Sequence, residues 1–360
     1  NGISSLGCAL SDDAVFTWAG FGINKNDIES GNYWISNDKI SDLGSGLFQN
    51  SRVYIGSIMI SENIVNDSKE DRDAFNIEGM AYDMHDYSIL DFEGLCFVNN
   101  TFTYSTLLAG GLTKAAYFLY DRSQARIGPL IVSRNRVNAL EKTGLEVYFG
   151  NIGYYLHDDS KVEFLGVSVD NNSVFCLRRG IFLNSIQGVG FNLHNNSFVR
   201  SGEISVENNS IKSEVGIQTS SIEHIGDLMD GSSRFEGERF SFGHNQINSS
   251  GYGIHLNGWA KMGYRLSGES HAEFGGLCIH DNHIESGSTS IEVVQPAYLG
   301  SVLSGSSMAN IGGIDIIRND VEGSRGITVR NSIGMGYDLQ ETSEAMIGAI
   351  RINENDVESE

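Results

Sequence analysis

The stretch Val167–Val174, which reads VSVDNNSV, carries the pattern that decides the fold. Two apolar residues, Val167 and Val169, are separated by one position. Asn172 follows three positions later, and the apolar Val174 comes two positions after it. Apolar residues that alternate with polar ones are typical of a β-strand with one face turned inward. The stretch therefore predicts two short strands that meet at an asparagine.

The same pattern recurs along the whole chain, and its asparagine marks each copy. These anchor asparagines are Asn26, Asn63, Asn100, Asn135, Asn172, Asn209, Asn245, Asn282, Asn319 and Asn355. Successive anchors are 35 to 37 residues apart. Since one short repeat cannot bury its own apolar face, such repeats must stack on one another.

Other features of the repeat exclude a helical solenoid. A second short strand follows the anchor, as in Ile254-x-Leu256, and a third element follows a glycine, as in Met262-Gly263. The three-and-four apolar spacing of helical repeats is missing, and 43 glycines would weaken helices. Only two prolines occur, which suits strands that donate every N–H to a neighbour. The sequence predicts an all-β fold of parallel stacked coils.

With this ladder of apolar pairs and asparagines, the chain resembles the right-handed parallel β-helix proteins, a group that includes pectate-lyase-like enzymes. The resemblance concerns architecture and implies about ten coils of a ~37-residue repeat with ~4.8 Å between coils. Handedness follows from the resemblance and from the rule for parallel crossovers. The repeat is longer than is usual for that group, so we expect one side of the coil to be extended or indented.

Residues 1–360 are expected to form one β-solenoid domain that starts and ends in the middle of a repeat. No capping element is evident at either end, and open strand edges invite further strands. We therefore expect the rod to continue, either within a longer protein or by end-to-end stacking of copies.

The anchor asparagines have two interpretations. Their amides can bond from coil to coil as a structural ladder, or they can serve as ligands or glycosylation sites. Ten copies at one position of the repeat favour the ladder. Sequons for N-glycosylation occur at Asn66, Asn99, Asn171, Asn195, Asn208 and Asn248. Most of them arise automatically from an Asn-Asn-Ser/Thr turn, so glycosylation stays an open expectation.

The charge of the chain limits its partners. A formal net charge of −22 argues against nucleic acid and against an anionic membrane surface. No cofactor is expected. Three acidic clusters, around Asp67–Asp73, Asp83–Asp86 and His157–Asp159, are interpreted as solvated loops, with calcium binding as the alternative. The four cysteines, Cys8, Cys96, Cys176 and Cys278, lie turns apart, so neither a disulfide nor a metal cluster is expected.

No catalytic residue is predicted, because no turn departs clearly from the repeat. Trp18, Trp34 and Trp259 fall at different phases, so no aromatic stripe is expected, although binding of a polysaccharide stays open. The leading hypothesis is a structural protein, a segment of an extracellular fibre, sheath or cell-surface stalk, whose partners are copies of itself end to end or laterally. The alternative is a carbohydrate-active or carbohydrate-binding β-helix protein, such as a polysaccharide lyase, hydrolase or adhesin.

Overall fold

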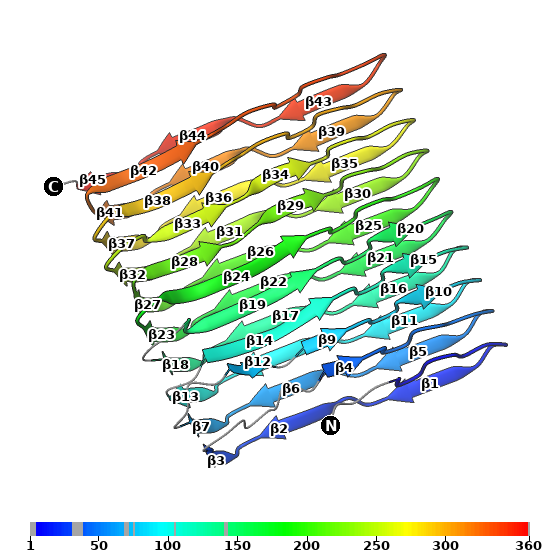
Figure 1. The fold of residues 1–360 in the computed structure, drawn as a ribbon, viewed down its shortest axis with the longest axis horizontal. Helices are drawn as coiled ribbons and strands as arrows, with labels where there is room; N and C mark the ends of the chain where they lie inside the picture. The colour runs from blue at the N-terminus through cyan, green and yellow to red at the C-terminus, as the bar shows by residue number, and fades with distance from the viewer. Residues whose placement is uncertain are drawn as a thin grey trace.

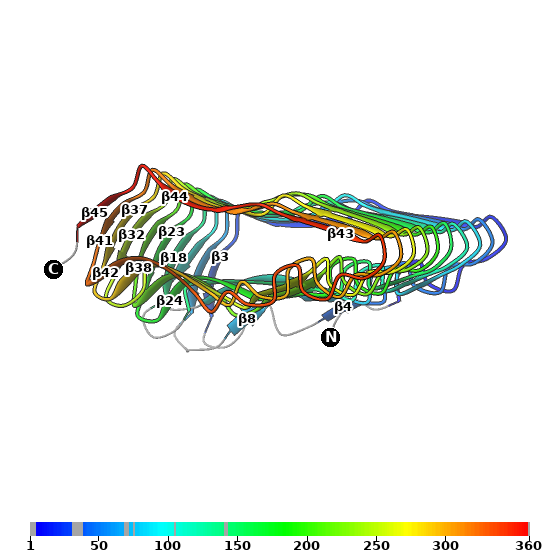
Figure 2. The same cartoon turned by 90° about the horizontal axis from the view of Figure 1, so that it is seen from above.

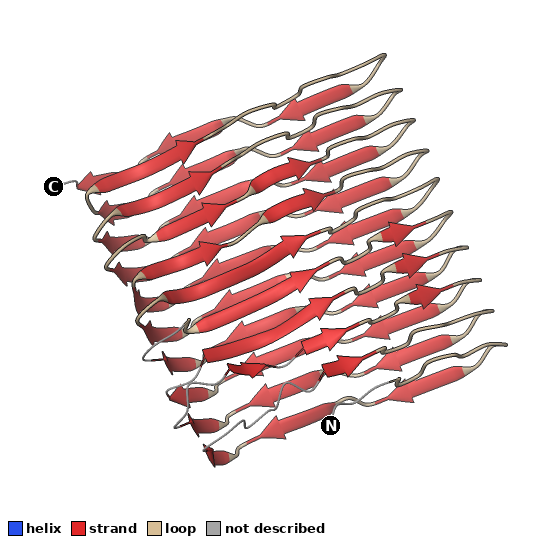
Figure 3. Ribbon diagram, viewed as in Figure 1, coloured by secondary structure: helices blue, strands red, loops and turns tan. Residues whose placement is uncertain are grey.

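The computed structural model describes residues 5–30, 39–67, 72–74, 76–103, 106–139 and 143–358. The elements of these residues are all β-strands joined by turns (Figure 3). No described segment forms a helix that is long and apolar enough to cross a membrane. The strands stack in parallel from the first coil to the last (Figure 1). The protein is a parallel β-solenoid, as the sequence predicts.

Two sheets of ten strands each form one long wall of the solenoid. Sheet 1 contains β1 (Val15–Trp18), β5 (Arg52–Ile55), β11 (Ile89–Phe92), β16 (Gln124–Ile127), β21 (Lys161–Phe164), β25 (Phe198–Ser201), β30 (Arg234–Gly237), β35 (His271–Phe274), β39 (Met308–Ile311) and β43 (Glu344–Ile347). Sheet 2 contains β2 (Phe21–Asn24), β6 (Ile58–Ser61), β12 (Leu95–Val98), β17 (Leu130–Ser133), β22 (Val167–Asp170), β26 (Ile204–Glu207), β31 (Phe240–Gly243), β36 (Leu277–His280), β40 (Ile314–Ile317) and β44 (Ile350–Asn353).

Three further sheets are formed by the rest of the coils. Sheet 3, at the narrow end, contains β3 (Asp27–Ser30), β7 (Ile64–Asp67), β13 (Thr101–Thr103), β18 (Arg136–Ala139), β23 (Ser173–Cys176), β27 (Ser210–Ser213), β32 (Gln246–Ser249), β37 (His283–Ser286), β41 (Asp320–Glu322) and β45 (Asp356–Glu358). Sheet 4, the opposite wall, contains β4 (Lys39–Ser41), β8 (Arg72–Ala74), β9 (Asn76–Glu78), β14 (Thr106–Thr113), β19 (Leu145–Gly150), β24 (Arg179–Gln187), β28 (Val215–Thr219), β29 (Ile222–Ile225), β33 (Ile254–Asn257), β34 (Trp259–Met262), β38 (Thr289–Val294) and β42 (Arg325–Arg330). Sheet 5 is short and contains β10 (Asp83–Met84), β15 (Phe118–Leu119) and β20 (Tyr155–Leu156).

The coil is strongly flattened (Figure 2). Sheets 1 and 2 run along one side, and the chain turns at the anchor asparagine into sheet 3 and returns along sheet 4. Between sheet 4 and the next strand of sheet 1, each coil has a long turn-rich segment, here called the arm, which ends in a tight turn. In three coils the arm carries a strand of sheet 5. The arm is the extended side that the long repeat predicts.

The register of the strands places equivalent residues directly above one another. In sheet 2, Val167 pairs with Ile204 and Val169 pairs with Val206. These side chains are buried between the two walls. The amides of Asn172 and Asn209 lie 3.0 Å apart, which confirms that anchors one repeat apart are stacked.

The bend between sheets 1 and 2 requires glycine because the backbones of adjacent coils approach closely there. Gly166 has a φ of +93°, and a Cβ on this residue would overlap the carbonyl oxygen of Glu203 in the next coil. Glycine has no such conflict and adopts positive φ at little cost. This packing explains the glycine found at this bend in most coils, for example Gly20, Gly94 and Gly202.

Candidate functional site

The anchor asparagines form one continuous hydrogen-bonded ladder inside the corner between sheets 2 and 3. Each Nδ2 donates to the Oδ1 of the anchor in the next coil at 2.8–3.1 Å. The same Oδ1 also accepts the backbone N–H of the preceding anchor, as from Asn172 to Asn209 at 2.9 Å. The eight anchors from Asn63 to Asn319 are buried. At this bend the backbone cannot form all the hydrogen bonds of a β-sheet, and the anchor side chains bond the backbone N–H and C=O groups that would otherwise lack partners.

The ladder has a direction. Each internal anchor accepts from the anchor on its N-terminal side and donates to the anchor on its C-terminal side. Asn26 therefore presents its Oδ1 acceptor at one end, and Asn355 presents donors at the other. The two ends are complementary in hydrogen bonding.

All six sequon asparagines are exposed at the surface. Asn195 donates to Asp158 at 3.0 Å, and Asn248 donates to Glu285 at 2.7 Å, each in an adjacent coil. The acidic cluster at Asp67–Asp73 falls mostly outside the described residues. The four cysteines are free thiols, and burial raises the pKa of Cys176 to about 11, so it is a poor nucleophile.

Aromatic rings form two columns along the arm, so the expectation that no aromatic stripe exists is wrong. Tyr82, Tyr117, Tyr154 and Phe191 stack with ring centroids 4.6–5.3 Å apart. A second column contains Phe48, His85, Tyr120, His157 and His194, with centroids 4.5–5.2 Å apart. Within each column the rings stack face to face, so only their edges are accessible to a sugar. The columns are therefore better suited to holding the arms together than to stacking on a glycan.

The second column makes stability depend on pH. Burial, followed by the charge of His194, lowers the pKa of His157, and the nearby Asp158 and Asp230 only partly offset this. Between that lowered value and the ordinary value of about 6.5, the unfolded chain binds more protons than the folded chain. Stability contributed by this site is therefore lost as the pH falls through about 6.5.

We expect His157→Tyr, which repeats the residue at position 120, to reduce the fall in Tm on acidification. The measurement is thermal unfolding of the parent chain and the variant between about pH 8 and pH 5. An unchanged pH slope in the variant would show that this histidine does not contribute.

In the coil after Phe191, a carboxylate interrupts the first aromatic column. The position that holds Tyr154 and Phe191 in earlier coils, and Tyr264 in the next, is occupied by Asp227. The side chain of Asp227 is fully buried. Arg265 donates to both of its oxygens at 3.0 and 3.3 Å, and Nδ1 of His224 contacts it as well. This substitution was visible in the sequence as Gly226-Asp227 aligned with Gly153-Tyr154 and Gly263-Tyr264.

The polar groups around Asp227 are all partnered. Lys261 Nζ lies 3.2 Å from His224 Nε2 and 3.7 Å from Glu223. Lys261 can therefore donate to Nε2 while Nδ1–H donates to Asp227. This cluster is a closed set of donors and acceptors, in which part-exposed cationic groups neutralise one buried carboxylate.

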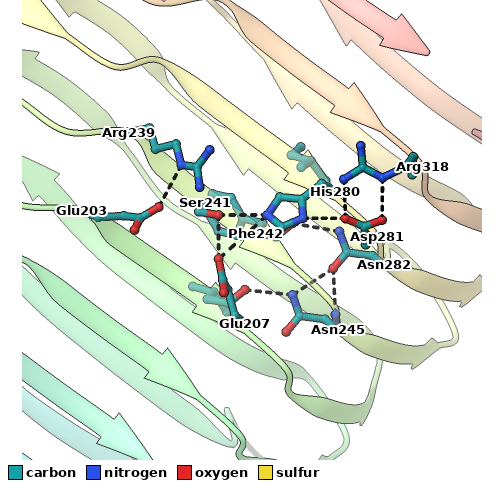
Figure 4. A network of polar contacts seen from close by, with 12 residues as sticks. Glu203, Glu207, Arg239, Ser241, Phe242, Asn245, His280, Asp281, Asn282 and Arg318 are labelled. Atoms are coloured by element: carbon teal, nitrogen blue, oxygen red, sulfur yellow. Dashed lines mark hydrogen bonds and ion pairs between the residues drawn. The ribbon is translucent and has the colours of Figure 1, made fainter. Parts of the chain in front are cut away.

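A second polar network lies on the outer face of sheet 2 (Figure 4). His280, at the end of β36, lies over β31, where Ser241 Oγ is 3.2 Å from its Nε2. Ser241 donates to Glu207 of the coil before at 2.7 Å. Gly243 makes room for this arrangement, because a Cβ there would collide with the imidazole of His280. The equivalent position of sheet 2 carries a side chain in the other described coils, such as Asn24, Ser61 and Glu207.

The other side of His280 faces Asp281. Nδ1 of His280 and Oδ2 of Asp281 are 2.9 Å apart. Arg318 of the next coil binds both carboxylate oxygens of Asp281 at 2.7 and 2.8 Å. Hydrogen bonding to Arg318 holds the pKa of Asp281 far below its usual value. His244 of the preceding coil lies beside His280 with its ring nearly perpendicular, and the repeat pattern gives no signal of this contact.

Shallow grooves lie where sheet 1 bends into sheet 2. One of about 500 Å³ is lined by Glu163, Arg200, Glu203 and Glu238 among others. A neighbouring groove of about 430 Å³ shares Arg200 and Glu238 and adds Glu273. Both are open to solvent and rich in carboxylates.

Comparisons with protein-family models, with curated proteins and with solved structures found no match to this chain. The fold therefore defines the class, a parallel β-solenoid, and the function has to be argued from the geometry.

Proposed function

We propose that this protein is a structural segment of an extracellular fibre, sheath or surface stalk, built by head-to-tail stacking of solenoid coils. The observation that carries the proposal is the state of the last described coil. Ile350, Ile352 and Val357 are 43%, 48% and 47% exposed, whereas the residues beneath them, Ile314, Ile316 and Val321, are 3%, 0% and 0% exposed. These apolar side chains have the positions and the partners of core residues, and a further coil, of a longer chain or of a second copy, would bury them.

The polarity of the asparagine ladder supports a head-to-tail arrangement. Asn355 offers donors where Asn26 of another copy offers an acceptor, and β44 offers an open edge to β2 of that copy. An interface between two different surfaces that does not close into a ring generates a filament. The exposed sequons support a location outside the cell, where such acceptors are used.

We expect the 360-residue chain to associate in a concentration-dependent way into species of increasing length. Because neighbouring copies each carry a charge of −22, screening by salt should strengthen the association. Ile352→Lys places a charge in the stacking face and should give monomers. Met346→Lys, in the same coil but on the outer wall, changes the charge equally and should leave association intact.

Sedimentation velocity over a range of protein and salt concentrations measures this. A parent chain that stays monomeric at every concentration contradicts the proposal, and so does equal association of the Ile352→Lys variant.

A second candidate function is favoured by the grooves at the sheet 1–sheet 2 bend. Their carboxylates, on adjacent coils beside Arg200, have the composition of a carbohydrate-binding or carbohydrate-cleaving surface. Retention on a glycan array would support a binder, and release of reducing ends from a polysaccharide would support an enzyme.

A further inference from the structure

The hydrogen bonds around His280 determine which of its ring nitrogens carries a proton. Ser241 has one hydroxyl hydrogen and donates it to Glu207, a carboxylate that only accepts. The oxygen of Ser241 must then accept from Nε2–H of His280, 3.2 Å away. The other ring nitrogen, Nδ1, faces Asp281 (Figure 4).

The contact between His280 and Asp281 then needs a positive charge, from a second proton on the ring or from a bound metal ion. In neutral imidazole with Nε2 protonated, Nδ1 is an acceptor, and so is Oδ2 of Asp281 at 2.9 Å. Two facing acceptors repel unless a proton on Nδ1 joins them or a metal ion is bound by both atoms. The chain His280–Ser241–Glu207 also matches the way in which metal-binding histidines donate their second N–H to an outer partner, which fixes the ring.

A third ligand group lies beside this contact. His244 belongs to the preceding coil, and its ring is 5.2 Å from that of His280, nearly perpendicular to it. Ligand atoms of His244, His280 and Asp281 all lie within 4.8 Å of one another. His244 and Asp281 each immediately precede an anchor, Asn245 and Asn282, so the asparagine ladder holds both corners in place.

We propose that His244, His280 and Asp281 form a binding site for a divalent transition metal ion of the zinc class. Two imidazoles and one carboxylate are a ligand set that suits Zn²⁺, with the fourth position left to water. Calcium and magnesium prefer sites made entirely of oxygen ligands and are disfavoured here. The site lies on the outer wall, away from the stacking faces, so it is independent of the proposed assembly.

Arg318 is the competitor built into this site. It holds both oxygens of Asp281, but its own side chain is 49% exposed, so it can turn into solvent when a metal ion arrives. Removal of Arg318 should therefore strengthen metal binding, whereas removal of a ligand should weaken it. These opposite signs distinguish a specific site from general attraction to an acidic surface.

The test is titration of the chelator-treated chain with ZnCl₂ by calorimetry, with Co²⁺ absorption as a second probe of the ligand geometry. The variants His244→Asn and Asp281→Asn introduce asparagine, which the repeat already has at this corner in Asn171 and Asn208. The fold should therefore survive. We expect one Zn²⁺ per chain, at least about tenfold weaker binding in both variants, since each loses a ligand, and tighter binding in Arg318→Ala.

His283→Asn is the matched control, because His283 is exposed in the same coil but lies outside the cluster. It should bind Zn²⁺ like the parent chain. The proposal is overturned if the parent chain binds no Zn²⁺, if His244→Asn binds as the parent does, or if His283→Asn weakens binding as much as His244→Asn.

Discussion

Replacing Asn209 by alanine is expected to lower the free energy of unfolding by about 4 kcal/mol. The change removes the acceptor of two buried donors, the backbone N–H and the Nδ2 of Asn172. It also removes the donor that reaches the carbonyl of Val169 in the coil before. Each buried polar group left without a partner costs about 1–3 kcal/mol. Urea unfolding followed by circular dichroism measures the loss, and hydrogen exchange should rise locally at Asn172.

Asn208→Gly is the matched control. Asn208 is the adjacent residue, exposed, with a φ of +57°, which glycine adopts without strain. This variant should change stability by only about 0.5 kcal/mol. If the two variants were equally stable, the ladder would not hold the corner together.

Replacing Asp227 by alanine is expected to cost about 3 kcal/mol. The carboxylate is fully buried, and its removal leaves Arg265 and His224 without their shared partner. Breaking a buried ion pair by deleting one member costs about 3–5 kcal/mol, and the part-exposed Arg265 can regain some of this by turning to solvent. Thermal and urea unfolding of the variant give the measurement.

Asp230→Ala separates this effect from a simple change of charge. Asp230 pairs with His194 at 2.7 Å, but its side chain is 47% exposed, so its loss should cost much less. A second variant, Asp227→Tyr, restores the aromatic residue that the repeat carries at this position and should be more stable than Asp227→Ala. Equal stability of the parent chain and Asp227→Ala would contradict the role assigned to this cluster.

The stacking of the coils could be predicted from the sequence because it depends on features that every repeat shares. Pairs such as Val167 and Val169, followed by an anchor, recur at 35 to 37 residues, and only a stacked coil buries them all. The aromatic columns keep the same period, but tyrosine, phenylalanine and histidine replace one another within them. A search that follows one residue type, such as tryptophan, therefore misses them, and Trp259 is in fact a core residue.

The metal-binding group could not be found in the same way. His244 and Asp281 lie at equivalent corners one coil apart, but His280 joins them only because Gly243 lets its ring lie across β31. That contact depends on a missing side chain in the neighbouring coil, which no local motif reveals. The role of Arg318 could not be predicted either. It lies at the same corner one coil further on, and its hydrogen bonds to Asp281 exist only because the coils are stacked.

Electron cryomicroscopy of the chain at high concentration tests the assembly most directly. We expect filaments in which the ~4.8 Å axial spacing of the coils runs without interruption from one copy to the next, with Asn355 of one copy stacked on Asn26 of its neighbour. Separate rods whose terminal apolar residues stay exposed to solvent at every concentration, or copies joined through their side walls alone, would contradict it.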